Sequence, residues 1–381
     1  MVKKLLAFCS LFFFVSGFSQ NFTASENTAV SILTVGTADA SHSLYGHTAL
    51  RIKDAQTGLD VVYNYGMFDF ATPNFMLKFV KGDLQYFAAA YPYADFEYNY
   101  RVENRSIYEQ VLNLSVAEKQ TLLTRLNSSL ASEDNYYTYK FIDRNCTTKV
   151  IDIVNEVLEG APIQKRNIKE ESYRDVLYPY VDHHFYQKLG INIIFGHRVD
   201  NQATQIFLPF DLHENLELTS YKNQPLVTTS TTIFEANRIQ PFSFVDSIYS
   251  LVLLLLIIVL VNKKWLNTVY FLVMGSIGLL FSVIGSYSLH QEVLWNYNEL
   301  LFNPLLLLLV YFLIARKENA IRITAWIIFG LLIVYCIYML NKVHLPIVLP
   351  IVFTTFVLLL RELFPQKWII GRGKTKPYYR S

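Results

Sequence analysis

The sequence predicts an α+β exported domain followed by an all-α membrane domain of five transmembrane helices. Segments that resemble strands alternate with helical segments between residues 20 and 240, a pattern typical of an α+β domain. Five long apolar runs follow, and such runs predict membrane-spanning helices. The mean hydropathy of +0.25 agrees with a membrane protein. A net charge of only +2 does not favour a nucleic-acid-binding protein.

Residues 1–19 are predicted to be a secretory signal peptide. Two lysines precede an apolar run over residues 5–18, and small residues stand just before Gln20. A charged region, an apolar stretch and a small-residue cleavage site together define such signals. Cys9 lies inside the apolar stretch, so we expect the mature protein to lack it.

Residues 20–243 are expected to form one exported, periplasmic domain with a mixture of strands and helices. Predicted strands cover residues 30–37, 44–52, 61–65 and 107–114, with a hairpin loop over residues 54–60 between the second and the third. Ser115 and Glu118 form a capping-box pattern, which predicts a helix over residues 115–130. The aromatic-rich segment 68–100 shows no regular pattern. Gly46 removes a side chain where another backbone or a substrate could approach closely.

Residues 244–364 are predicted to be the membrane domain, and residues 365–381 a basic cytoplasmic tail. If the first helix enters the cytoplasm, the inner loops and the tail carry eleven Lys and Arg residues, whereas the outer loops carry one. This asymmetry satisfies the positive-inside rule. The apolar runs are Ser247–Val261, Leu266–Ser286, Leu301–Ala315, Ile321–Leu340 and Leu345–Leu360.

Cys146 is the candidate nucleophile of the exported domain. It precedes a helical pattern that Gly160 ends, and Asp143 or Asn145 could cap that helix. A thiol at a helix N-terminus has a lowered pKa because the unpaired amides and the helix dipole favour the thiolate. Cys336 lies in the fourth apolar run, so Cys146 has no disulfide partner in its domain. The alternative is that Cys146 packs as a small buried apolar residue, although its neighbours are polar.

His47 is the candidate general base, because a thiol nucleophile needs an imidazole to accept its proton and return it later. Other histidines, at positions 42, 183, 184 and 197, are competitors. A third polar group should orient the imidazole. Asn64, on the predicted return strand, is the nearest candidate, with Asp143 or His42 as substitutes. No ligand spacing around Cys146 favours a metal site.

Several motifs together resemble the Lnb-type lipoprotein N-acyltransferase family. They are SLYGHTALRI, VVYNYGMFDF, YTYKFIDRNCTTKV, SYRDVL, GHRVDNQATQIFLPFDL and the predicted outer loop LHQEVLWNYNELLFNP. The exported domain also resembles, more distantly, the circularly permuted NlpC/P60 group of papain-like thiol enzymes. In that group the histidine strand precedes the cysteine helix, as His47 precedes Cys146 here. The resemblance implies a papain-like fold with Cys146 as nucleophile, His47 as base and Asn64 as a possible third member.

The resemblance also implies acyl transfer at the bacterial inner membrane. A phospholipid would donate the acyl chain, a diacylated lipoprotein would accept it at its N-terminal cysteine, and no metal or other cofactor would be needed. Tyr297 and Asn298 of the outer loop could position lipid headgroups, or that loop could be an ordinary aromatic belt. The same residues are also compatible with a membrane-tethered cysteine amidase or peptidase. A non-catalytic envelope scaffold is the third reading.

Overall fold

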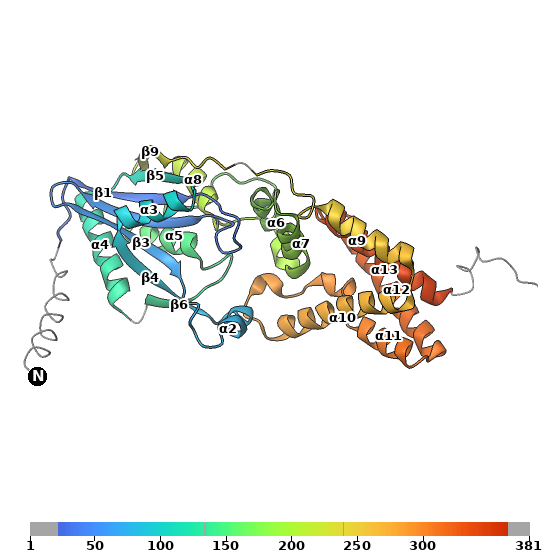
Figure 1. The fold of residues 1–381 in the computed structure, drawn as a ribbon. Helices are drawn as coiled ribbons and strands as arrows, with labels where there is room; N and C mark the ends of the chain where they lie inside the picture. Colours follow the sequence, from blue (N-terminus) through green and yellow to red (C-terminus); the bar gives the residue numbers. More distant parts are fainter. Residues whose placement is uncertain (1–21, 133–134, 239, 365–381) are drawn as a thin grey trace, which may run out of the picture.

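The computed structural model describes residues 22–132, 135–238 and 240–364 (Figure 1). The predicted signal peptide and basic tail lie outside these residues. The described chain has an α+β region built on a sheet, followed by a helical region, as predicted. Figure 1 shows the sheet region and the long C-terminal helices at opposite ends of the molecule, with α6 (Tyr173–Leu177) and α7 (Phe185–Ile194) between them.

The N-terminal region is organised around a seven-stranded antiparallel sheet with strand order β6-β4-β3-β2-β1-β5-β9. The predicted hairpin is confirmed: β2 pairs with β3, with Ala49 opposite Asn64. The strands are β1 (Thr28–Val35), β2 (His47–Asp54), β3 (Leu59–Met67), β4 (Gln85–Pro92), β5 (Ile107–Leu112), β6 (Tyr136–Thr138) and β9 (Val227–Phe234); β7 (Ser220–Tyr221) and β8 (Gln224–Pro225) form a separate pair.

Both faces of the sheet are covered by helices. Successive side chains of a strand point to opposite faces, so one strand contributes to two cores. Ile32 of β1 faces a core shared with α4 (Val116–Ala131), α5 (Cys146–Val157) and α8 (Pro209–Glu217). Its neighbour Leu33 faces the opposite core, which contains Phe96 of α3 (Tyr93–Val102). Ser115 caps α4 through a complete capping box, as predicted. The cysteine helix is therefore packed directly on the sheet.

The aromatic segment 68–100, for which the sequence showed no regular pattern, contains regular elements. It forms α2 (Phe75–Lys81), then β4 and α3. The short α2 buries none of its residues, so it lacks the one-sided apolar pattern that reveals a core helix. Gly82 ends it with a left-handed backbone conformation.

The C-terminal region consists of α9 (Ile248–Val261), α10 (Lys264–Tyr287), α11 (Leu305–Ile314), α12 (Glu318–Met339) and α13 (Leu345–Leu363). Among the described residues, α10, α12 and α13 are long and apolar enough to cross a membrane. A fourth span results if residues 291–300 and α11, which meet at 41°, count as one. At 14 residues, α9 is shorter. A multi-pass membrane region is confirmed, and the count of five remains a prediction.

A buried polar network joins the two regions. Arg174 of α6 donates to Asp200 over 2.7 Å, and Asp200 also accepts from Lys342 and from the Tyr297 hydroxyl. Asn298, which is fully buried, donates to the backbone oxygen of Asn192 in α7. Tyr297 and Asn298 therefore hold the outer loop against the N-terminal region, rather than lying free for lipid headgroups.

Candidate active site

The site lies where the start of β2 meets the start of α5. Gly46, immediately before His47, has φ +83°, and a Cβ at this position would lie 2.5 Å from the backbone oxygen of Val35. The close backbone approach predicted at Gly46 is therefore present. Only glycine fits, since an L side chain would be strained there as well as crowded. This glycine allows the backbone to approach Val35 of β1 closely just before β2 begins, with His47 as the first residue of β2.

Asn145 fixes where the cysteine helix begins. Its side-chain oxygen accepts from the Thr148 N–H over 3.0 Å, and its amide group donates to the backbone oxygens of Phe141 and Phe207. Of the two predicted caps, Asn145 is therefore the one used, while Asp143 pairs with Arg198. Cys146 becomes the first residue of α5. Its backbone N–H is one of the first-turn donors that lack a partner inside the helix.

Cys146 is a half-buried residue, and the pKa of its thiol is lowered. Burial by itself raises the pKa of this thiol, because it disfavours the charged form. The charge of His47 and a hydrogen bond from its imidazole lower the pKa, as do a backbone hydrogen bond from Thr48 and the Thr147 hydroxyl. These contributions outweigh burial, so the thiolate is favoured. The structure thus brings His47 and Cys146 together.

Asn64 completes a chain of three side chains. Its Oδ1 lies 3.0 Å from Nε2 of His47, and the residue is fully buried in β3. A carbonyl oxygen can only accept, so this contact is satisfied when Nε2 carries the proton. Nδ1 is then the nitrogen that can exchange a proton with the thiol. Asn64, rather than Asp143 or His42, is therefore the residue that the structure places against the imidazole.

Aromatic residues that the sequence did not single out surround the thiol. A Cβ on Gly66 would lie 3.5 Å from Cβ of Cys146 and 4.0 Å from the Tyr137 hydroxyl. Burial, and then the negative charge of Cys146, raise the pKa of both Tyr137 and Tyr139, so both remain protonated donors. The Tyr100 ring lies 6.4 Å from the His47 ring, tilted by 32°. Two of these tyrosines stand within YTYKFIDRNCTTKV. The pairing of β6 with β4 positions Tyr137, and stacking on Tyr86 of β4 positions Tyr139.

Two of the competing histidines have other partners. His184 pairs with the carboxylates of Asp39 and Asp246, and Nδ1 of His197 lies 3.3 Å from the Tyr338 hydroxyl. Across the residues that the structure describes, no three His, Cys, Asp or Glu side chains gather in a way that could hold a metal ion. The cysteine, the histidine and the asparagine are suited to thiol-based acyl chemistry.

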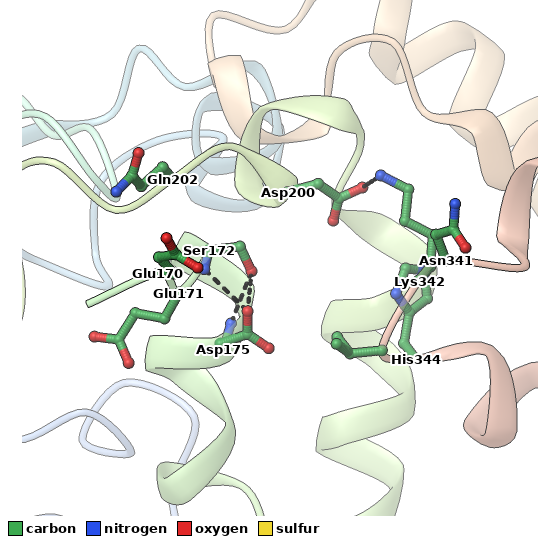
Figure 2. Close-up of a pocket in the computed structure, with 10 residues that line it drawn as sticks. Glu170, Glu171, Ser172, Asp175, Asp200, Gln202, Asn341, Lys342 and His344 are labelled. Atoms are coloured by element: carbon green, nitrogen blue, oxygen red, sulfur yellow. Dashed lines mark hydrogen bonds and ion pairs between the residues drawn. The ribbon is translucent and has the colours of Figure 1, made fainter.

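A cavity of about 460 Å³ lies at the junction of the two regions (Figure 2). Figure 2 shows the ion pair between Asp200 and Lys342 in its lining, with Ser172 hydrogen-bonded to Asp175 at the start of α6. Its lining does not include Cys146, His47 or Asn64. This cavity belongs to the polar network that joins the regions, not to the thiol.

Comparison with known protein families gives a match for the N-terminal region. Residues 17–179 match the family model of the Lnb N-terminal periplasmic domain. That segment includes the candidate nucleophile, the histidine and the asparagine. No curated protein and no solved structure matches the chain, so the resemblance to NlpC/P60 enzymes stays a prediction.

Proposed function

We propose that the protein is a membrane-bound lipoprotein N-acyltransferase, because residues 17–179 match the family model of the Lnb N-terminal periplasmic domain and several apolar helices follow. The observation that carries this proposal is the position of His47. Its imidazole contacts the Cys146 thiol and, through Nε2, Asn64. A nucleophile, a base and an orienting group are the minimum set for covalent acyl transfer.

In the first half-reaction, the Cys146 thiolate attacks an ester carbonyl carbon of a phospholipid. The new S–C bond gives a tetrahedral intermediate with a negative oxygen. When this intermediate collapses, the C–O bond to glycerol breaks, and the His47 imidazolium gives its proton to the leaving alkoxide. The products are a lysophospholipid and an acyl-thioester on Cys146, with His47 now neutral.

In the second half-reaction, the free α-amine of a lipidated N-terminal cysteine attacks the thioester. An N–C bond forms and the S–C bond breaks. Neutral His47 takes a proton from the amine, so the starting thiolate and imidazolium are restored. The amide product carries the acyl chain that the phospholipid lost. The ester supplies the acyl group in activated form, so the residues of this chain suffice for the reaction.

Two donors support stabilisation of the negative oxygen in both half-reactions. One is the first-turn backbone N–H of Cys146 at the N-terminus of α5, where the helix dipole favours negative charge. The other is the Tyr137 hydroxyl, which stays protonated beside the thiol. Hydrogen-bond donors held in advance around a developing charge contribute strongly to acyl transfer.

We also propose five membrane spans, with the C-terminal tail in the cytoplasm. Supporting this, the loops that follow α10 and α12 both contact the N-terminal region, through Leu289 and Lys342. The basic residues at 263, 264, 316 and 317 lie at the other ends of these helices. Helix α9 is short for a span, but all fourteen of its residues except Tyr249 and Ser250 are aliphatic. A papain-like fold is supported by the packing of the cysteine helix on an antiparallel sheet that contains the histidine strand.

The test in cells is mass spectrometry of lipoprotein N-termini. Cells that carry the wild-type protein should contain N-acylated lipoproteins, whereas cells that lack it or carry Cys146→Ser should accumulate the free amine. An unchanged acylation state would overturn the transferase proposal. If cell-wall fragments or cleaved proteins depended on Cys146 instead, the amidase or peptidase reading would replace it.

A further inference from the structure

An exposed apolar patch lies on the segment between β3 and β4. Four large side chains, Phe70, Met76, Leu77 and Phe79, form it, and they are 70%, 65%, 68% and 45% exposed. Helix α2, which carries three of them, buries no residue at all. Apolar side chains gathered on one exposed element mark an interaction surface.

The patch is fixed at the outer end of a membrane-spanning helix. The N–H of Leu289 donates to the backbone oxygen of Lys81 over 2.7 Å, and the Ser288 hydroxyl donates to that of Val80 over 2.9 Å. Nε2 of His290 lies 2.8 Å from the backbone oxygen of Phe79. These bonds hold α2 directly beside the end of α10, as Figure 1 shows. If α10 spans the bilayer, a surface at this position lies at the membrane boundary.

The patch is also continuous with the thiol. Phe70 contacts Phe68 at a ring separation of 4.9 Å, Phe68 contacts Tyr86 at 5.4 Å, and Tyr86 stacks on Tyr139 at 4.5 Å. Tyr139 is one of the tyrosines near Cys146 described above. The same stretch of chain begins at Gly66, which packs against Cys146 itself. Aromatic rings therefore lead from the exposed patch to the nucleophile.

Basic residues accompany the patch. Lys78 and Lys81 lie in the last turn of α2, and Lys140 extends to the backbone oxygen of Leu289 at the end of α10. Positive side chains beside an apolar surface fit the phosphate level of a bilayer, with the apolar groups directed towards the acyl chains. A protein partner would not need this position at the end of a membrane helix.

From these observations we propose that the patch Phe70, Met76, Leu77 and Phe79 inserts into the outer leaflet beside α10 and delivers the phospholipid acyl chain to Cys146. The delivery step rests on the proposed acyl-transfer function, whereas the insertion does not. An acyl chain that leaves the bilayer exposes its methylene groups to water, and each exposed methylene costs free energy. A donor acyl chain needs an apolar path to the thiol, and the proposed path follows the aromatic series.

Photo-crosslinking tests the insertion. A benzophenone amino acid replaces Phe70 or Leu77 in the full-length Cys146→Ser protein, in proteoliposomes of phosphatidylethanolamine and phosphatidylglycerol with radiolabelled acyl chains. Tyr98 of α3, 67% exposed, is the matched control, and Leu280 of α10 is the positive control. We expect labelling at positions 70 and 77 several-fold above that at Tyr98. Labelling no greater than at Tyr98, with Leu280 labelled, would overturn the insertion.

The delivery step is tested with Leu77→Asp and the control Tyr98→Asp in the otherwise wild-type protein. We expect Leu77→Asp to slow acyl-thioester formation on Cys146 by roughly tenfold, because a charged group is costly at apolar depth, and Tyr98→Asp to have little effect. Equal rates of acyl-thioester formation in Leu77→Asp and Tyr98→Asp would overturn delivery through the patch. If the wild-type protein forms no thioester, the acyl-transfer function fails, while the crosslinking result in Cys146→Ser still decides the insertion.

Discussion

Nε2 of His47 lies 3.0 Å from Oδ1 of Asn64, a fully buried side chain on the neighbouring strand. The contact joins the first residue of β2 to the middle of β3, so the register of the hairpin determines the orientation of the imidazole. It leaves Nδ1 as the nitrogen available to Cys146. The catalytic proposal depends on this arrangement.

Asn64→Ala should lower kcat by about 10- to 100-fold with little change in KM, because the ring loses the acceptor that selects its tautomer and orientation. Asn64→Asp, which keeps an acceptor, should retain more activity than the alanine variant. The measurement is steady-state transfer from phospholipid to a diacylated lipopeptide. A kcat equal to that of the wild type in Asn64→Ala would exclude the orienting role.

The rate of Cys146 alkylation by iodoacetamide should rise with pH through a midpoint below the ordinary thiol pKa of about 8.5. The direction follows from the lowered pKa of Cys146, which His47 lowers against the effect of burial. His47→Ala should move the midpoint upward, because burial still raises the thiol pKa while the imidazole no longer lowers it. The measurement uses a Cys336→Ala background, so that only one thiol of the mature chain reacts. Identical midpoints with and without His47 would contradict the pairing.

Gly46→Ala and Gly58→Ala form a matched pair. Both glycines have positive φ, +83° and +75°, but only at Gly46 would the added Cβ overlap a backbone atom, 2.5 Å from the Val35 oxygen. Gly58→Ala should therefore cost about 1 kcal/mol of unfolding free energy from backbone strain alone. Gly46→Ala should cost clearly more and misplace His47. Thermal unfolding of the full-length protein in detergent measures both, and equal shifts in Tm would contradict the close approach.

Arg174→Met tests the network that joins the two regions. Arg174 and Asp200 have side chains only 1% and 7% exposed, and removal of the cation leaves a buried carboxylate with fewer partners. We expect a loss of about 3–5 kcal/mol in unfolding free energy and easier proteolysis between the two regions. Lys222→Met, which removes the ion pair of an exposed lysine with Glu118, should cost clearly less. Similar Tm values for both variants would show that the buried network does not stabilise the fold.

Local signals allowed much of this structure to be predicted from the sequence. The β2–β3 hairpin, the capping box at Ser115 and the start of a helix at Cys146 all depend on residues a few positions apart. The placement of Asn64 opposite Ala49 follows once the hairpin is recognised, which is why the partner of His47 could be suggested in advance.

Features that depend on distant contacts were not predictable in this way. Tyr137 is brought near the thiol by the pairing of β6 with β4, and Tyr139 by stacking on a ring of β4. Helix α2 is fixed by bonds to residues about 200 positions away. Tyr297 and Asn298 were expected to face lipid or to form an aromatic belt. Long-range contacts with Asp200 and Asn192 instead place them in the junction.

The most direct test of the central claim is the mass of the intact full-length protein after incubation in proteoliposomes with a phospholipid of defined acyl chains. The account predicts an adduct of one acyl chain on Cys146 that hydroxylamine removes. Addition of a diacylated lipopeptide should transfer that chain to the peptide's α-amine, and Cys146→Ser should form neither the adduct nor the product. Formation of N-acylated peptide by Cys146→Ser at the wild-type rate would contradict the account.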